Sequence, residues 1–309
     1  MITQPTAPRK RILSGVQPSG KLHLGNYFGA VRQHVALTTE NADCFYFIAD
    51  YHALTTVHDP VALRQHVLDV ALDYFALGPD PEKAVFFRQS DVPQVCELAW
   101  ILSTLAPMGL LERAVSYKEK IDRGLESSVG LFTYPVLMAA DILICRSNLV
   151  PVGRDQVQHL EICRDLAVKF NLRYGEVFPL PEYRLTKESK VPGTDGQKMS
   201  KSYGNTIPLF EDEKKLQKAV NKIVTNLKAP GEPKGTDESP LFEIYKAFAT
   251  PADTAAFTQA LADGLAWGEA GAGTASNTAS IFSRSLLLSC SGSGFSRKSC
   301  LRASSRRSG

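Results

Sequence analysis

The stretch that decides the fold is ILSGVQPSGKLHLGN, at residues 12–26. Its first five residues, Ile12 to Val16, form an apolar run of the length of a buried strand. A turn containing Pro, Ser and Gly follows, and the pattern predicts a helix that begins near Gly25. Because a helix N-terminus with nearby glycines suits phosphate groups, the stretch predicts an anion site directly after the first strand.

Short apolar runs alternate with helical patterns beyond this stretch. Further buried strands are expected at Cys44 to Ala49, Ala84 to Phe87 and Leu149 to Val152, and helices at Val61 to Leu77 and Asp155 to Phe170. Such alternation predicts an α/β fold with a parallel sheet covered on both faces. Ligands bind beyond the carboxyl ends of the strands in these sheets, so the segments after Val16, Ala49 and Val152 are candidate site segments.

The composition is that of an ordinary globular protein, with 44% hydrophobic and 22% charged residues. The longest apolar stretch, Val136 to Cys145, is interrupted by Asp141 and is shorter than the ~20 residues that span a bilayer. The first eleven residues lead into no apolar core of a signal peptide, so a cytoplasmic location is expected. The six cysteines have no metal-binding spacing, and neither a disulfide nor a protein-held metal is predicted.

The pattern changes after Ile207 to charged helices without strand signals, expected at Glu211 to Leu227, Pro240 to Phe248 and Ala252 to Leu265. We therefore predict an α/β domain at 1–207, a helical domain at 208–269 and a Ser- and Arg-rich tail at 270–309. The tail holds six Lys or Arg and no acidic residue, a composition typical of disorder. The first 269 residues carry 29 basic and 32 acidic groups, so the net charge of +3 neither supports nor excludes nucleic-acid binding.

A second motif, Lys198-Met199-Ser200-Lys201-Ser202, lies about 175 residues after the first. Its two lysines stand three residues apart in a Gly- and Ser-rich segment, where they can offset the charge that develops on a leaving pyrophosphate. Either motif alone is weak evidence for a nucleotide site, but the pair predicts an adenylate-forming ATP site.

A third constellation lies in the apolar helix expected to start near Thr133, with Pro135 in its first turn. Tyr134, Met138 and Asp141 then share one face. A buried carboxylate needs hydrogen bonds, and an indole N–H is a suitable donor while Met138 and Tyr134 pack against its ring. The structural alternative is an Asp satisfied by a backbone amide or an arginine, with Met and Tyr as core.

These segments resemble the HxGN and KMSKS signatures of the class I aminoacyl-tRNA synthetases, and the whole pattern is similar to bacterial or organellar tryptophanyl-tRNA synthetases. Further matching segments are Ser14 to Gly20, Gly25 to Ala30, Tyr134 to Asp141 and Val150 to His159. The resemblance covers residues 11 to about 269. It implies a Rossmann-like catalytic core, ATP with Mg²⁺, L-tryptophan and tRNA(Trp) as substrates, and a homodimer with its contact at about 91–130.

The resemblance also implies roles for individual residues. Lys198 and Lys201 would hold the triphosphate through the transition state, with help from Lys118, and Asp141 would bind the indole N–H. The implied ATP-binding residues are Gln17, Pro18, Ser19, His23, Gly25, Asn26, Gly153, Arg154, Asp155, Val191, Lys198, Met199, Ser200, Lys201 and Ser202. The rest of the tryptophan pocket would be Tyr134, Met138, His52, Val150, Val152 and Gln156.

The tail departs from the family, whose members continue after the segment around Trp267 through further charged helices that help to bind tRNA. A shifted reading frame is our preferred hypothesis for the tail, and a lineage-specific extension is the alternative. Two other functions stay open: a tyrosyl-tRNA synthetase, which needs partners for a phenol hydroxyl, and a synthetase-like protein that does not charge tRNA.

Overall fold

The computed structural model describes residues 9–271 except 41, 78–79, 115–127, 186–190, 227 and 238. Lys118 and nearly all of the predicted tail lie outside the described residues. The chain divides into two compact units. Unit 1 comprises the described parts of Met1–Gly20, His34–Ala71 and Pro79–Lys187, and unit 2 those of Lys21–Gln33, Leu72–Gly78 and Glu188–Gly309. The division by packing therefore does not coincide with the boundary that we placed at 207.

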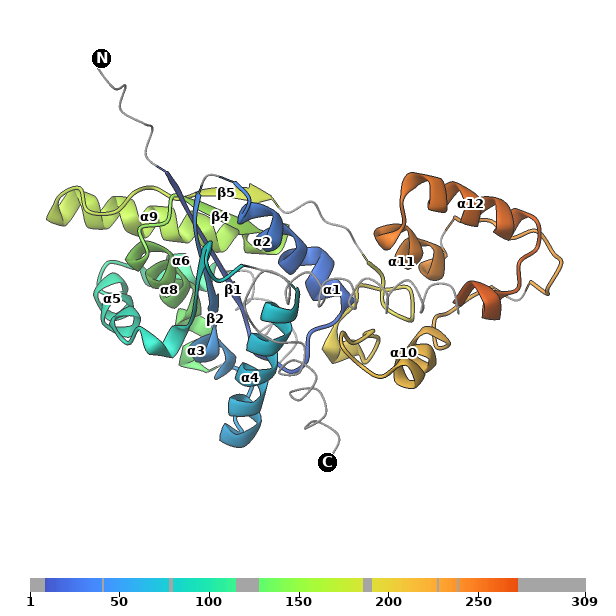
Figure 1. Cartoon of the computed structure of the whole chain (residues 1–309). Helices are drawn as coiled ribbons and strands as arrows, with labels where there is room; N and C mark the ends of the chain where they lie inside the picture. Colours follow the sequence, from blue (N-terminus) through green and yellow to red (C-terminus); the bar gives the residue numbers. More distant parts are fainter. Residues whose placement is uncertain are drawn as a thin grey trace, which may run out of the picture. The chain divides into compact units, whose positions relative to one another are not determined.

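Unit 1 is built on a parallel sheet with strand order β3-β2-β1-β4-β5 (Figure 1). The strands are β1 (Lys10–Val16), β2 (Ala42–Ile48), β3 (Ala84–Arg88), β4 (Leu149–Val152) and β5 (Glu182–Leu185). Val16 pairs with Ile48, and Ile48 pairs with Arg88, so the first three strands end level with one another. The chain leaves β1 toward β2 on one side and returns to β4 on the other, which makes this edge the topological switch point where α/β sheets bind ligands.

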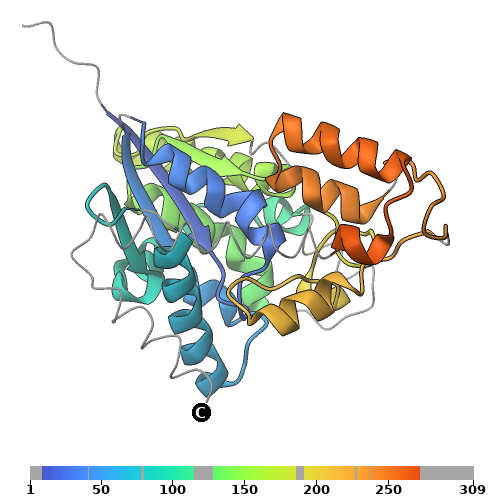
Figure 2. The same ribbon diagram turned by 45° about the vertical axis from the view of Figure 1, so that its right-hand side comes forward.

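Helices pack on both faces of the sheet, as the alternation predicts. On one face, α8 (Val129–Ile144) lies beside α9 (Val157–Tyr174) and α5 (Gln94–Ser103) (Figures 1 and 2), and their apolar residues form one core with Leu13, Phe47 and Val150 of the strands. On the other face, His34 of α2 (Arg32–Leu37) stacks on Tyr46 of β2 with ring centroids 4.8 Å apart. The remaining described helices of this unit are α3 (Asp50–Ala53) and α6 (Met108–Glu112), and α4 (Pro60–Leu77) runs from unit 1 into unit 2.

Unit 2 combines the HxGN segment with the helices of the second half. Among its described helices are α1 (Leu24–Asn26), continued by a π-helical turn at Tyr27–Val31, then α10 (Glu213–Val220), α11 (Pro240–Phe248) and α12 (Pro251–Ala262). Side chains cap the last three: Asp212 accepts from the Lys215 N–H, Ser239 from the Phe242 N–H, and Thr250 from the Asp253 N–H. Pro240 and Pro251 stand in the first turns, where a proline costs no hydrogen bond.

Two expectations about local structure are wrong. The helix with Asp141 begins at Val129 rather than near Thr133, so Pro135 lies inside it, because the Ser128 hydroxyl caps an earlier turn by accepting from the Leu131 N–H at 3.2 Å. α10 ends at Val220 rather than near Leu227. Of the described helices, none is both long enough and apolar enough to cross a bilayer.

Candidate active site

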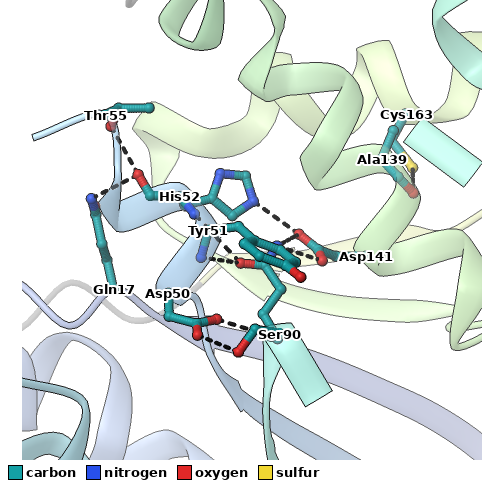
Figure 3. Close-up of polar contacts among 10 residues, drawn as sticks. Gln17, Asp50, Tyr51, His52, Thr55, Ser90, Ala139, Asp141 and Cys163 are labelled. Atoms are coloured by element: carbon teal, nitrogen blue, oxygen red, sulfur yellow. Dashed lines mark hydrogen bonds and ion pairs between the residues drawn. The ribbon is translucent and has the colours of Figure 1, made fainter. Parts of the chain in front are cut away.

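Polar side chains gather where β1, β2 and β3 end. Gln17 follows β1, His52 lies in α3 just after β2, and Gln89 is the first residue after β3. Figure 3 shows the His52 ring pointing toward Asp141, which comes from α8. The Gln17 side chain reaches α3, where its Nε2 donates to the His52 carbonyl at 3.3 Å. The level ends of these strands thus bring together residues that lie far apart in the sequence.

Asp141 is the buried charge at the centre of this cluster, with 4% of its surface exposed. His52 Nε2 lies 2.9 Å from Oδ2, and Gln89 Nε2 donates to Oδ1 at 2.8 Å and to Oδ2 at 3.0 Å. Burial raises the pKa of the Asp141 carboxyl, and the hydrogen bonds from His52 and Gln89 oppose that rise. Neither partner of the structural alternative, a backbone amide or an arginine, is among these contacts.

Tyr134 stands two turns before Asp141 on α8 and contacts two histidines. Its hydroxyl is hydrogen-bonded to His159 Nε2, and its ring meets the His52 ring edge-on with centroids 6.1 Å apart. Burial lowers the pKa of His159, which favours a neutral imidazole that can accept the phenol proton.

The other residues predicted for the tryptophan pocket lie on the same elements. Met138 is half-buried on α8 between Tyr134 and Asp141 in sequence. Val150 and Val152 are buried on β4, where alternation puts both on one face. Gln156 is half-buried in the turn before α9, and its Nε2 donates to Asp155 at 3.0 Å.

The predicted ATP residues of unit 1 occupy two loops after neighbouring strands. Gln17 and Ser19 are exposed after β1, and Pro18 between them is buried. After β4, Gly153 leads into a short turn that carries Arg154 and Asp155, both exposed. β1 and β4 are neighbours in the sheet, so these two loops leave from adjacent strand ends.

In unit 2, a hydrogen bond between Gly25 and Met199 joins the HxGN segment to the KMSKS segment. The Gly25 N–H points to Met199 Sδ at 3.3 Å, and a Cβ at position 25 would come within 3.0 Å of the His23 ring. The Asn26 side chain accepts from the His23 N–H at 3.0 Å. His23 is buried, its Nδ1 has no hydrogen-bond partner among the described residues, and burial together with Lys201 lowers its pKa to about 4.

Asn205 holds the KMSKS segment in place. Its Oδ1 accepts from the Ser200 N–H at 2.8 Å, and its Nδ2 donates to Asp195 at 2.7 Å and to the Lys198 carbonyl at 3.1 Å. A Cβ on Gly193 would collide with this amide, which explains the glycine. Asn205 is buried, so these hydrogen bonds are made on the side of the loop that faces away from solvent.

The predicted residues of this segment differ in exposure. Lys198 is exposed, Met199 and Val191 are buried, and Ser200 and Lys201 are half-buried. Burial lowers the pKa of Lys201, and Asp73 opposes this. Ser202 lies in the turn Lys201–Tyr203.

The sequence reading missed Gln89 and Asn205. The rule that marked the segments after Val16, Ala49 and Val152 as candidate site segments applies equally to Gln89, which lies two residues after the expected strand end at Phe87. No such rule points to Asn205, whose importance comes from the folded loop. Within the part of the chain that the structure describes, no group of three or more His, Cys, Asp or Glu is placed to hold a metal ion.

Comparisons with known proteins place this chain in a family. Residues 6–283 match the family described as tRNA synthetases class I (W and Y). Over 273 residues the chain is 52% identical to the tryptophan–tRNA ligase of Neisseria meningitidis, covering 85% of this chain and 81% of that protein. The chain belongs to the class I tryptophanyl-tRNA synthetases.

Further relatives agree with this assignment. The tryptophan–tRNA ligase of Rhodopirellula baltica is 57% identical over 244 residues, which are 79% of this chain and 76% of that protein. The crystal structure of tryptophanyl-tRNA synthetase from Campylobacter jejuni, complexed with ADP and tryptophan, superposes with a TM-score of 0.84 at 47% identity and covers 90% of this chain and 88% of that one. The resemblance inferred from the motifs and the Rossmann-like fold class are confirmed.

Proposed function

We propose that this protein is a tryptophan–tRNA ligase, which activates L-tryptophan with ATP and transfers it to tRNA(Trp) with release of AMP and diphosphate. One observation carries the proposal: a buried carboxylate, Asp141, stands at the centre of the unit 1 cluster in a chain 52% identical to a tryptophan–tRNA ligase. An indole N–H is a donor without acceptor capacity, so a carboxylate held by two donors suits it and leaves no donor for a phenol oxygen. The tyrosyl alternative is therefore disfavoured.

In the first step, an oxygen of the tryptophan carboxylate attacks the α-phosphorus of Mg-ATP, and the bond to the pyrophosphate oxygen breaks. The protein provides position and positive charge, and no residue forms a covalent intermediate. We assign Lys198 and Lys201 to the charge that develops on the pyrophosphate, and His23 Nδ1 to a phosphate oxygen, with the Gly25 and Asn26 backbone lining the phosphates. Mg²⁺ enters with ATP as part of the substrate.

In the second step, a hydroxyl of the terminal ribose of tRNA attacks the carbonyl carbon of tryptophanyl-adenylate, and AMP leaves. α10 supports binding of the tRNA backbone: Lys214 and Lys218 are exposed on it one turn apart, and Lys222 is exposed in the turn that follows, while Leu216 and Val220 are buried. Lysines on one face of a helix neutralise phosphates and make binding sensitive to salt. A cytoplasmic location fits these substrates.

We also propose a homodimer. Large apolar side chains are exposed on α5, α6 and the start of α8, including Trp100 (74% exposed), Met108 (63%) and Val129 (77%). Large apolar side chains exposed on neighbouring helices support an interaction surface there. Sedimentation of the purified protein and of a Trp100→Glu variant tests the proposal, which fails if both are monomers.

The activity is tested by exchange of pyrophosphate into ATP, with tryptophan and separately with tyrosine. Exchange with tryptophan alone supports the proposal, and exchange with tyrosine, or with neither, contradicts it. Aminoacylation of tRNA(Trp), measured in parallel, distinguishes a complete ligase from a protein that only activates the amino acid.

A further inference from the structure

The buried side chain of Gln89 uses both ends of its amide in hydrogen bonds. It is 0% exposed and follows directly on β3. Its Nε2 donates to both oxygens of Asp141, while its Oε1 accepts from the Tyr51 N–H at 3.0 Å and the His52 N–H at 3.4 Å. The amide can be placed only this way round, because the reversed amide would set a carbonyl oxygen against a carboxylate and an NH₂ group against two N–H donors.

The amide therefore links the carboxylate to the start of α3. The backbone around Gln89 is held independently, since the Ser90 N–H and hydroxyl donate to Asp50 at 3.0 and 2.5 Å. Figure 3 shows this second pair of bonds beside the His52 and Asp141 contact. Loss of the Gln89 side chain should thus free the Asp141 carboxylate without releasing the turn that carries it.

We propose that Gln89 is a specificity-determining positioning residue, which orients the Asp141 carboxylate so that a lone pair faces the indole N–H of tryptophan. The inference rests on the function proposed above. The Gln89 Nε2 holds both carboxylate oxygens from one side, at 2.8 and 3.0 Å, and His52 occupies one further site on Oδ2. A carboxylate offers about four acceptor positions, so one remains for the ligand.

The test compares tryptophan with 3-(1-benzothiophen-3-yl)alanine, which replaces the indole N–H by sulfur and keeps the shape of the ring. The preference is the ratio of kcat/KM for the two amino acids in pyrophosphate exchange. In Gln89→Met we expect this preference to fall about tenfold, since a hydrogen bond to a charged group is misaligned, while the KM for ATP is unchanged. Gln259→Met, at an exposed glutamine of α12, is the matched control and should keep the wild-type preference.

A double-mutant cycle separates positioning from simple structural support. Asp141→Asn should also lower the preference, and the double variant should be no worse than the poorer single variant, because both changes disturb one interaction. If the variants raise KM equally for both amino acids, or if their effects add, Gln89 is only structural and the inference is overturned.

A variant that fails to fold and a wild type without activity have different consequences. If Gln89→Met loses its near-UV circular dichroism, Gln89→Asn, which keeps the amide but shortens its reach, takes its place with the same expected fall; failure of both to fold overturns the inference. If the wild-type protein shows no exchange with tryptophan, the proposed function itself fails. A wild type that is active, with variants of unchanged preference, refutes the role of Gln89 alone.

Discussion

At the scale of single residues, charge and hydrogen bonding decide the assignments. Lys201 is half-buried, its pKa is lowered by burial, and it also depresses the pKa of His23, so the two groups lie in one electrostatic environment. In the proposed reaction, positive charge at this place stabilises the leaving pyrophosphate more than the bound substrates.

We therefore expect Lys201→Met to lower kcat for pyrophosphate exchange by about 100-fold, the usual effect of removing one group that stabilises developing charge. The KM for tryptophan should stay within about twofold, because the amino acid does not need this lysine to bind. Steady-state kinetics checks both values, with Lys222→Met, an exposed lysine of the same unit, as control. A higher KM for tryptophan at unchanged kcat would contradict the assignment.

At the scale of elements, the loop from Gly193 to Asn205 depends on one buried amide. Asn205→Ala removes its bonds to Asp195, Lys198 and Ser200. We expect about 2 kcal/mol less stability and about tenfold lower kcat, since lysines on a loosened loop are less well placed. Urea unfolding and exchange kinetics measure both, and Asn221→Ala, an exposed change in the same unit, should leave both unaltered.

The connection before α11 depends on a buried lysine. Lys234 is 3% exposed, and its Nζ donates to the carbonyls of Ala229, Glu232 and Gly264 at 2.9, 3.0 and 3.4 Å. Lys234→Met removes these three bonds, while the Ala229 and Gly264 carbonyls keep their backbone donors. We expect the free energy of unfolding to fall by about 2 kcal/mol. Lys228→Met, which removes an exposed bond to the Pro233 carbonyl, should change it by less than about 0.5 kcal/mol. If urea unfolding gave the same loss of free energy for Lys234→Met and Lys228→Met, the burial of Lys234 would not contribute to stability.

The elements that the sequence predicted are those whose signal is local. Apolar runs located β1 to β4 within two residues at each end, and the expected helix Pro240 to Phe248 coincides with α11. β5 was missed because it is an edge strand with the sequence Glu-Tyr-Arg-Leu, mostly exposed and without an apolar run. The first turn of α8 was missed because a single hydroxyl, Ser128, starts the helix before Pro135.

The residues of the candidate site could be predicted from the sequence only where their signal is local. Motifs and strand ends pointed to His52, Asp141 and the KMSKS segment, whereas the partners of Asp141 depend on register. Gln89 reaches Asp141, 52 residues away in sequence, because β2 and β3 end level and α8 packs on the sheet. Because this contact depends on how the strands and α8 pack, no pattern in a single sequence predicts it.

At the scale of the whole molecule, buried histidines make the folded state sensitive to acid. Burial lowers the pKa of His34 to about 3, and burial with Lys201 lowers that of His23 to about 4, from an ordinary 6.5. Below pH 6.5 the unfolded chain takes up protons at these positions while the folded protein does not. The free energy of unfolding therefore falls as the pH falls from 6.5 toward 4. The raised pKa of Asp141 changes the free energy of unfolding in the opposite direction, but equally in the wild type and in a variant of His34, which does not contact Asp141.

We predict that the thermal midpoint of the wild type decreases steadily between pH 6.5 and 4.5, and that His34→Phe decreases less steeply. Phenylalanine can keep the stacking on Tyr46 but has no proton to gain, so the variant lacks one of the histidines whose pKa is lowered in the folded state. His58→Phe removes an exposed histidine and should follow the wild-type slope. Circular dichroism melts at several pH values give the three slopes. Equal slopes for His34→Phe and the wild type would mean that His34 already gains its proton in the folded protein, contrary to its burial.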